Sequence, residues 1–117
     1  TIQRKYFNKS VFKNQIVQHL GNAINIIPKL NFDFDLIFID ADKENYIKYF
    51  QLVSEKLNSN GLIISDNVLW SGKVVEGDND DEETNTIKKF NRILNDDKKF
   101  ETVILPLRDG ISISRLV

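Results

Sequence analysis

Two short apolar segments separated by a helical pattern constrain the fold of this 117-residue chain more than any other feature. Phe34–Asp40 (FDLIFID) and Leu62–Asp66 (LIISD) are continuous apolar runs, which are typical of strands covered on both faces of a sheet. Between them, Asp42–Leu57 repeats apolar and aromatic residues at helical spacing. A strand, a helix and a strand within about thirty residues predict a βαβ unit with parallel strands and a right-handed crossover.

The rest of the chain predicts further elements of both kinds. The other expected helices are Thr1–Lys9, Ala23–Leu30 (interrupted by Pro28) and Asn85–Asn95. The other expected strands are Gln15–Leu20, Phe100–Pro106 and Ser112–Val117. Arg108-Asp109-Gly110 predicts a hairpin turn between the last two strands, and Asn67–Thr84 predicts a loop. The chain is therefore expected to be α/β, and its length allows one domain.

The composition excludes several classes of protein. Hydrophobic residues make up 41% and charged residues 28%, which is typical of a globular protein. The net charge is −1, without the basic excess of a nucleic-acid-binding protein. No apolar run approaches the roughly 20 residues that span a bilayer. Cysteine is absent, which excludes disulfides and thiolate metal sites and fits a reducing cytoplasm.

Polar residues follow the two predicted strands of the βαβ unit. Asp40 ends the first strand, and Asp66 ends the second and is followed by Asn67. The carboxyl ends of neighbouring parallel strands lie about 5 Å apart at the edge where α/β sheets bind ligands. Two carboxylates and an amide oxygen, without histidine or cysteine, predict a site for a hard divalent cation such as Mg²⁺, Mn²⁺ or Ca²⁺.

Two further residues extend this candidate site. Lys43 begins the helix after Asp40 and can reach the same edge, where a lysine beside a cation has a lowered proton affinity and can act as a base. Trp70 follows the second strand on a loop and can form a wall for a flat substrate. Each residue alone is more often structural, but two strand-end acids on consecutive strands favour a functional site.

The sequence resembles the cation-dependent O-methyltransferases, which include the caffeoyl-CoA O-methyltransferases, their bacterial relatives and, more distantly, catechol O-methyltransferase. The resemblance rests on FDLIFIDADKENY (Phe34–Tyr46) and GLIISDNVLWSGKV (Gly61–Val74). Shorter matches lie at Gly21-Asn22-Ala23, Phe90-Asn91 and Asp109-Gly110. The resemblance implies the Rossmann-like sheet of S-adenosylmethionine-dependent methyltransferases, with an antiparallel hairpin at its C-terminal end.

The resemblance also implies an activity. The family transfers a methyl group from S-adenosylmethionine to one hydroxyl of a catechol-like vicinal diol, with the help of a divalent cation. By match, Asp40, Asp66 and Asn67 are the expected metal ligands, and Lys43 is the expected base. The expected partner is a small-molecule acceptor, with no nucleic acid and no membrane, and the expected state is a cytoplasmic homodimer.

Further matches imply where the cofactor and the acceptor bind. Gly21, Asn22 and Ala23 are expected against the adenine, although the family usually has an aspartate in place of Asn22. Asp40 is also expected near the methionine end of the cofactor. Trp70 is expected to line the acceptor pocket.

The resemblance covers the C-terminal portion of a single methyltransferase domain. Family members have an N-terminal half that supplies a glycine-rich loop and an acidic residue for the cofactor. This chain lacks those features, contains no methionine and begins at Thr1. The two absent strands would lie between Gln15–Leu20 and Phe34–Asp40, so we expect unpaired sheet edges. The isolated chain is expected to be unstable, swapped or completed by another chain, and inactive or weakly active.

Two other functions remain open from the sequence. Asp40-Ala41-Asp42 fits the D-x-D pattern of haloacid-dehalogenase-like phosphatases, but Lys43-Glu44-Asn45 stands where that family has threonine or valine and then glycine. A non-catalytic Rossmann-like remnant that binds or dimerises is favoured by the missing cofactor loop. Retention of the complete metal-site set and of Lys43 argues against it.

Overall fold

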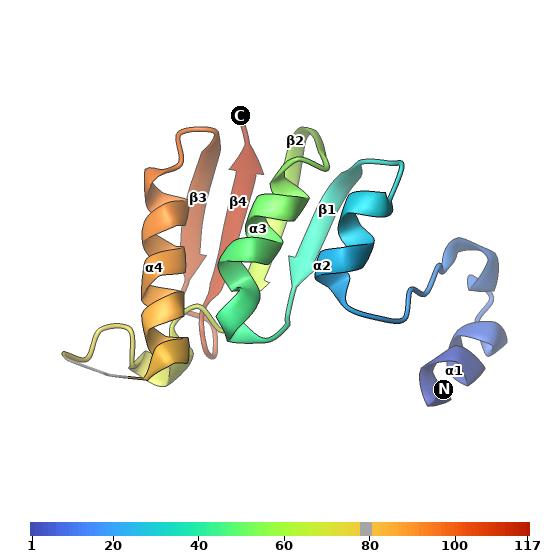
Figure 1. The fold of residues 1–117 in the computed structure, drawn as a ribbon, viewed down its shortest axis with the longest axis horizontal. Helices are drawn as coiled ribbons and strands as arrows, with labels where there is room; N and C mark the ends of the chain where they lie inside the picture. The colour runs from blue at the N-terminus through green and yellow to red at the C-terminus, as the bar shows by residue number, and fades with distance from the viewer. Residues whose placement is uncertain (78–80) are drawn as a thin grey trace.

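A computed structural model describes residues 1–77 and 81–117 as a four-stranded sheet with helices packed on one face (Figure 1). The helices and strands are α1 (Ile2–Lys9), α2 (Ala23–Ile26), β1 (Phe34–Ile39), α3 (Tyr46–Ser54), β2 (Leu57–Asp66), α4 (Glu82–Asp96), β3 (Phe100–Leu105) and β4 (Ile111–Leu116). Short 3₁₀ turns lie at Lys13–Gln15, Ile27–Lys29, Lys43–Asn45 and Trp70–Gly72.

The sheet has the strand order β1-β2-β4-β3. β1 and β2 are parallel and are joined through α3, which confirms the predicted βαβ unit. β4 is antiparallel to both β2 and β3, which confirms the predicted C-terminal hairpin. Ile39 on β1 is in register with Ser65 on β2, so the two parallel strands end side by side.

The core lies between the sheet and helices α3 and α4. Amphipathic spacing places Tyr46, Phe50 and Val53 of α3 and Phe90 of α4 on the faces that turn to the sheet, where all four are buried. The Phe90 ring meets Tyr46 and Phe50 edge to face, with centroids 5.4 and 5.9 Å apart. This packing fixes the N-terminal ends of α3 and α4 beside the carboxyl ends of β1 and β2.

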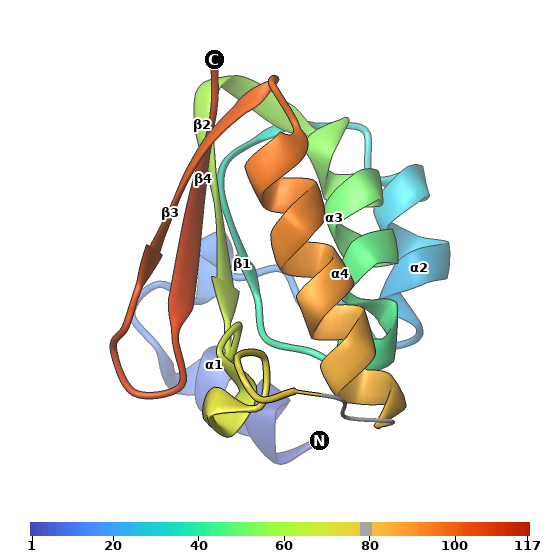
Figure 2. The same ribbon diagram turned by 90° about the vertical axis from the view of Figure 1, so that its left-hand side faces the viewer.

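The opposite face of the sheet carries apolar side chains that the described residues do not cover. The strand register aligns one such residue from each strand, in the row Phe38, Ile64, Ile113 and Val103. Phe38 is 57% exposed and Val103 is 52% exposed. Figure 2 shows α2, α3 and α4 together on the other side. The expectation that the first strand is covered on both faces is therefore wrong for the part of the chain described here.

The predicted strand Gln15–Leu20 is also wrong. Residues 13–15 form a 3₁₀ turn, and residues 16–20 are irregular, with Val17 75% and Leu20 64% exposed. β-branched residues favour an extended backbone, but a strand needs a partner ladder. This segment and α1 lie away from the sheet, so they pair with none of the strands (Figure 1).

Several element boundaries differ from the predicted ones. The helix expected to reach Leu57 ends at Ser54, and β2 begins at Leu57, with a register shift between its first pair and the next. α4 begins at Glu82, earlier than predicted, because the Asp81 side chain caps it. The predicted loop Asn67–Thr84 includes residues 78–80, which lie outside the described residues. None of the described helices has the length and apolar character that a membrane crossing requires.

Candidate functional site

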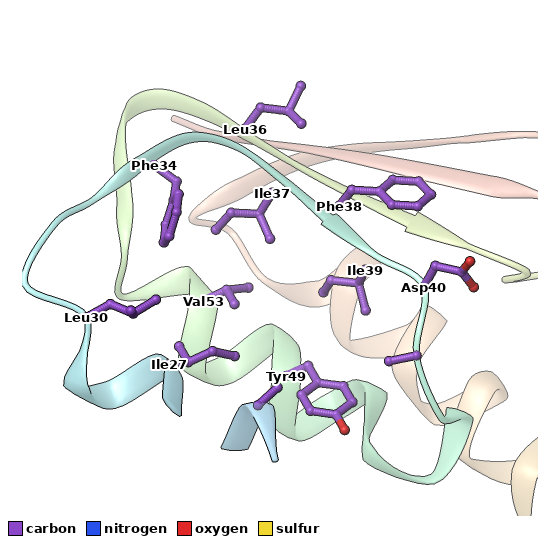
Figure 3. Close-up of a pocket in the computed structure, with 12 residues that line it drawn as sticks. Ile27, Leu30, Phe34, Leu36, Ile37, Phe38, Ile39, Asp40, Tyr49 and Val53 are labelled. Atoms are coloured by element: carbon purple, nitrogen blue, oxygen red, sulfur yellow. The ribbon is translucent and has the colours of Figure 1, made fainter. Parts of the chain in front are cut away.

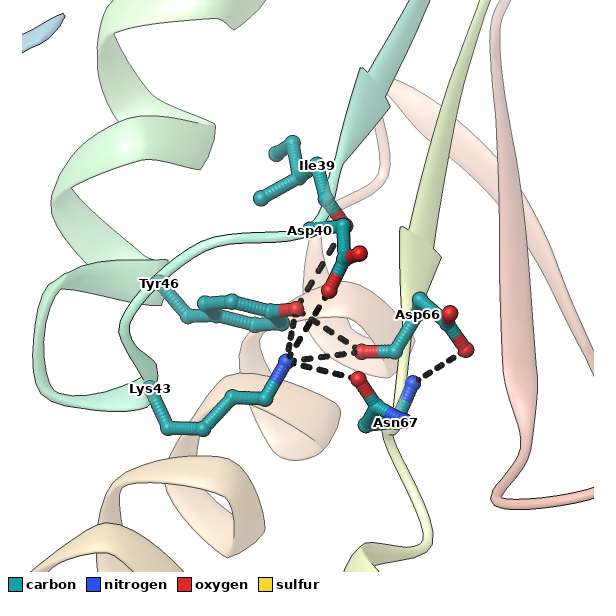
Figure 4. Close-up of polar contacts among 6 residues, drawn as sticks. All are labelled: Ile39, Asp40, Lys43, Tyr46, Asp66 and Asn67. Carbon is teal, nitrogen blue, oxygen red and sulfur yellow. Dashed lines mark hydrogen bonds and ion pairs between the residues drawn. The ribbon is translucent and has the colours of Figure 1, made fainter.

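The candidate site lies at the carboxyl ends of β1 and β2. Asp40 directly follows β1, Asp66 is the last residue of β2, and Asn67 comes next with a φ angle of 60°. Lys43 begins the 3₁₀ turn that leads into α3. The structure therefore brings together all four of these sequence-predicted residues (Figure 4).

The Lys43 ammonium is the centre of this cluster. Its Nζ donates hydrogen bonds to Asn67 Oδ1 at 3.0 Å and to the main-chain oxygen of Asp66 at 3.4 Å. Asp40 Oδ1 lies 4.0 Å from the same nitrogen. Lys43 is only 6% exposed, whereas the Asp40 side chain is 57% exposed. A buried positive charge is thus surrounded by oxygen acceptors, with one carboxylate open to solvent.

Burial also sets the proton affinity of Lys43. Removal from water lowers the pKa of the Lys43 amine, and the charges of Asp40 and Asp66 oppose this effect. The structure thus favours loss of the proton more than in an exposed lysine.

Tyr46 belongs to the cluster, although the sequence reasoning did not name it as a site residue. Its hydroxyl accepts a hydrogen bond from Lys43 Nζ and donates to the main-chain oxygen of Asp66 at 2.9 Å. Burial raises the pKa of the Tyr46 phenol, so it stays protonated and able to donate. The available signal was its spacing of three residues from Lys43, which places both side chains on one side of a helical turn.

The carboxylate and amide oxygens of the cluster are of the chemical type that binds hard cations. Asp40 and Asp66 supply carboxylates and Asn67 supplies an amide oxygen, the ligand types that Mg²⁺, Mn²⁺ and Ca²⁺ prefer. Figure 4 shows the Asp66 carboxylate turned away from Lys43, and its Oδ1 accepts the Asn67 N–H at 2.7 Å. Within the described ranges, no three His, Cys, Asp or Glu side chains form a metal cluster. The set fits a cation that would take the amide oxygen now held by Lys43.

Asp42, the second aspartate of the D-x-D pattern, makes its side-chain hydrogen bonds with Tyr49 and Asn45, which are not part of the Lys43 cluster. Its Oδ1 accepts the Tyr49 hydroxyl at 2.5 Å, and its other oxygen accepts the Asn45 side-chain amide. The hydrogen bond from Tyr49 is the main reason that the pKa of Asp42 is lowered, and it raises the pKa of Tyr49 to about 12. These contacts tie Asp42 to the start of α3, which disfavours the D-x-D interpretation.

An apolar pocket of about 380 Å³ runs along β1 beside α2 and α3 (Figure 3). Ala23 and Asp40 both line it, so the structure brings these two predicted cofactor-binding residues to one pocket. Asn22 caps α2 by accepting the Ile24 N–H at 2.9 Å, and Gly21 precedes it with a φ angle of 136°. Gly21 and Asn22 are not among the residues that line the pocket.

Trp70 lies beside the cluster. The centroid of its ring is 5.8 Å from Lys43 Nζ. The loop that carries it is held to α4 by Asn91, whose side-chain amide donates to the main-chain oxygen of Val68 at 2.8 Å. Trp70 therefore stands beside the buried amine, and its expected role as a wall for the acceptor stays a prediction.

Comparisons with known proteins all indicate the same family. A family model described as O-methyltransferase matches residues 1–117. A catechol O-methyltransferase from Niastella koreensis is 31% identical over 110 residues, which cover 91% of this chain and 50% of that protein. Caffeoyl-CoA O-methyltransferase 1 from Eucalyptus globulus is 34% identical over 108 residues, covering 83% and 44%.

A solved structure agrees with these sequence matches. The SAH-bound methyltransferase of Podospora anserina superposes with a TM-score of 0.74 at 29% identity, covering 91% of this chain and 53% of that one. The chain thus spans about half the length of the curated relatives it matches.

Proposed function

Because this chain belongs to the O-methyltransferase family, we propose that the whole protein of which it is part methylates one hydroxyl of a catechol-like acceptor. S-adenosylmethionine, when bound, supplies the methyl group. The observation that carries the proposal is the cluster of Asp40, Lys43, Asp66 and Asn67 at the carboxyl ends of two parallel strands. A vicinal diol offers two adjacent oxygens to such a site.

We propose that Asp40, Asp66 and Asn67 hold a divalent cation. When bound, such a cation acts as a Lewis acid that lowers the pKa of a coordinated hydroxyl. Asp40 is the solvent-facing member of the three and can bind without losing a hydrogen bond, because its only polar contact among the described residues is the ion pair with Lys43. Asp66 and Asn67 are connected through the hydrogen bond between Asp66 Oδ1 and Asn67 N–H.

Lys43 is the proposed base. Burial lowers the pKa of Lys43, so its proton is lost more easily than that of an exposed lysine, and an amine that has lost it can accept the proton of the acceptor hydroxyl at Nζ. The Tyr46 hydroxyl and the main-chain oxygen of Asp66 hold Nζ in place while it does so, because a bound cation would take Asn67 Oδ1. Orientation of the reacting groups is the other contribution that the protein makes to methyl transfer.

The proposed cofactor and acceptor positions flank this cluster. Ala23 and Asp40 line the apolar pocket, which supports a cofactor position there. Gly21 and Asn22 directly precede Ala23 and are proposed to contact the adenine. Trp70 beside Lys43 supports a wall for the flat acceptor ring. We further propose that residues 1–117 are the C-terminal portion of the methyltransferase domain and that the whole protein is a cytoplasmic homodimer.

The test is methyl transfer from radiolabelled S-adenosylmethionine to catechol by the whole protein. We expect turnover with Mg²⁺, loss of turnover with EDTA, and a loss of at least about a hundredfold in Asp40→Asn. Asp35→Asn is the matched control, because Asp35 lies on the same strand β1 but is exposed at its other end. Turnover that survives both EDTA and Asp40→Asn would refute the proposed cation site. Cation binding without turnover would favour the non-catalytic remnant instead.

A further inference from the structure

The loop that leaves β2 has an unusual backbone where it carries Trp70. The φ angles of Trp70 and Ser71 are 49° and 55°, and Gly72 follows at 80°. A left-handed backbone is unfavourable for residues that have a Cβ atom. Two such residues in succession need contacts from outside their own segment to stay in this conformation.

The turn between β3 and β4 supplies these contacts. The main-chain oxygens of Gly110 and Asp109 accept the N–H groups of Val68 at 3.1 Å and Leu69 at 2.9 Å. The Asp109 carboxylate accepts the N–H of Ser71. Gly110 has a φ angle of 81°, and a Cβ atom there would overlap Leu69 Cγ, so the turn and the loop are in direct contact.

The Trp70 ring depends on this backbone for its position. Its indole N–H is buried and has no hydrogen-bond partner within the described part of the chain. Within the described residues no hydrogen bond of the ring therefore fixes its orientation beside Lys43, whose Nζ lies 5.8 Å from the ring centroid. The ring packs against the core, and the conformation of residues 70 and 71 sets the direction in which it leaves the backbone.

We propose that Asp109 is a positioning residue for Trp70. Its carboxylate oxygen holds the Ser71 N–H, which keeps the Trp70 and Ser71 backbone left-handed and the indole beside Lys43. The inference rests on the proposed function, because the ring beside Lys43 would serve as a wall for the acceptor. Asp109 touches no reacting group, and its carboxylate contacts this loop at the Ser71 N–H.

Three variants of the whole protein separate this role from a general structural one. Asp109→Ala removes the acceptor for Ser71 N–H. Asp109→Asn keeps an oxygen at the same place and should retain the position of the ring. Asp109→Ala combined with Ser71→Gly should recover part of it, because glycine adopts the left-handed backbone without the cost that serine bears.

The first readout does not depend on activity. Trp70 is the only tryptophan of this chain, and subtracting the spectrum of a matched Trp70→Phe variant isolates its fluorescence within the whole protein. We expect red-shifted emission and stronger acrylamide quenching in Asp109→Ala. We expect wild-type behaviour in Asp109→Asn and an intermediate result in the double variant. Cooperative unfolding of each variant verifies that it is folded.

The second readout is the kinetics of catechol methylation. We expect Asp109→Ala to raise the KM for the acceptor about tenfold, with little change in kcat. A tenfold change corresponds to the free energy of one hydrogen bond to a charged group. In a Trp70→Phe background the same substitution should add no further increase. Unchanged Trp70 emission in Asp109→Ala, or equal damage in Asp109→Asn, would overturn the inference. An inactive wild type with the expected fluorescence pattern would refute the proposed acceptor role and leave the positioning of Trp70 standing.

Discussion

The Tyr46 hydroxyl makes hydrogen bonds that connect two parts of the candidate site. It joins the Lys43 ammonium to the main-chain oxygen of Asp66, so it connects the start of α3 with the end of β2. Because Tyr46 is fully buried, each of these groups would lose one hydrogen-bond partner, with no water to replace it, if the hydroxyl were removed. The phenol therefore contributes to both stability and the position of the amine.

Tyr46→Phe should lower the free energy of unfolding of the whole protein by about 1–3 kcal/mol. It should also lower kcat about tenfold, because Nζ loses one of the groups that orient it. Tyr49→Phe is the matched control: Tyr49 lies on the same helix as Tyr46, and its hydroxyl donates to Asp42, which precedes the helix, and not to the Lys43 cluster. Steady-state kinetics and denaturant titration measure the two effects. Equal kcat values in the two variants would contradict an orienting role.

At this scale, the sequence predicted some residues of the site and missed others. Asp40, Asp66 and Asn67 could be placed together because the ends of adjacent parallel strands coincide. Tyr46 was interpreted as part of the helical apolar pattern, since spacing alone does not show where a phenol oxygen points. The contact between Asp109 and Ser71 joins residues 38 positions apart, and no local pattern predicts such a pair.

Among the elements, α4 shows how one charged side chain starts a helix. Asp81 caps it: its carboxylate accepts the Glu83 N–H at 3.1 Å and the Thr84 hydroxyl at 2.9 Å. The Lys73 ammonium lies 3.4 Å away. The Thr84 hydrogen bond is the main reason that the pKa of Asp81 is lowered below 3.8. The same carboxylate that begins the helix therefore makes its stability depend on pH.

The sign of this dependence follows from the lowered pKa. The folded state holds the charged form, so the stabilising effect is complete above 3.8, the unfolded value, and is lost as the pH falls through the folded value. Asp81→Ala should be less stable than wild type at neutral pH. Asp81→Asn keeps a capping oxygen, so it should lose only the part of the stabilisation that depends on the charge of the carboxylate and therefore on pH. Thermal unfolding between neutral pH and pH 3 measures this, and wild type and Asp81→Asn responding equally to acid would contradict it.

The elements also show what a periodic pattern can predict. β1, α3 and the hairpin β3–β4 lie close to where their patterns placed them, because their apolar faces pack against one another. Residues 16–20 carry β-branched side chains but form no strand. β-branched residues indicate a preference for an extended backbone. A strand forms only where a partner strand is available, and the local sequence does not show whether one is.

At the scale of the molecule, residues 1–77 and 81–117 leave one apolar face of the sheet uncovered and the outer edge of β1 unpaired. Parallel strands are usually covered on both faces, and here Phe38 and Leu36 of β1 are more than half exposed. The chain spans about half the length of its curated relatives. We therefore expect the rest of the whole protein to pack on this face.

Phe38→Lys distinguishes the isolated chain from the whole protein. In residues 1–117 alone, the substitution replaces an exposed aromatic ring and should reduce self-association. In the whole protein it should lower the free energy of unfolding by about 3 kcal/mol or more, because it buries a charge in place of a ring. Val117→Lys, at an exposed chain end, is the control. Sedimentation measures the self-association of residues 1–117, and denaturant titration measures the free energy of unfolding of the whole protein. A whole protein that Phe38→Lys destabilises no more than Val117→Lys does would contradict coverage of this face.

The most direct test of the whole account is titration of the whole protein with Mn²⁺, followed by electron paramagnetic resonance. We predict one site that Asp40→Asn and Asp66→Asn weaken by at least about tenfold, since each removes a charged ligand, and that Asp35→Asn leaves intact. Addition of catechol should change the spectrum of the bound ion. Wild-type Mn²⁺ binding in Asp40→Asn and Asp66→Asn, or a spectrum that catechol does not alter, would contradict a cation-assisted acceptor site at the ends of β1 and β2.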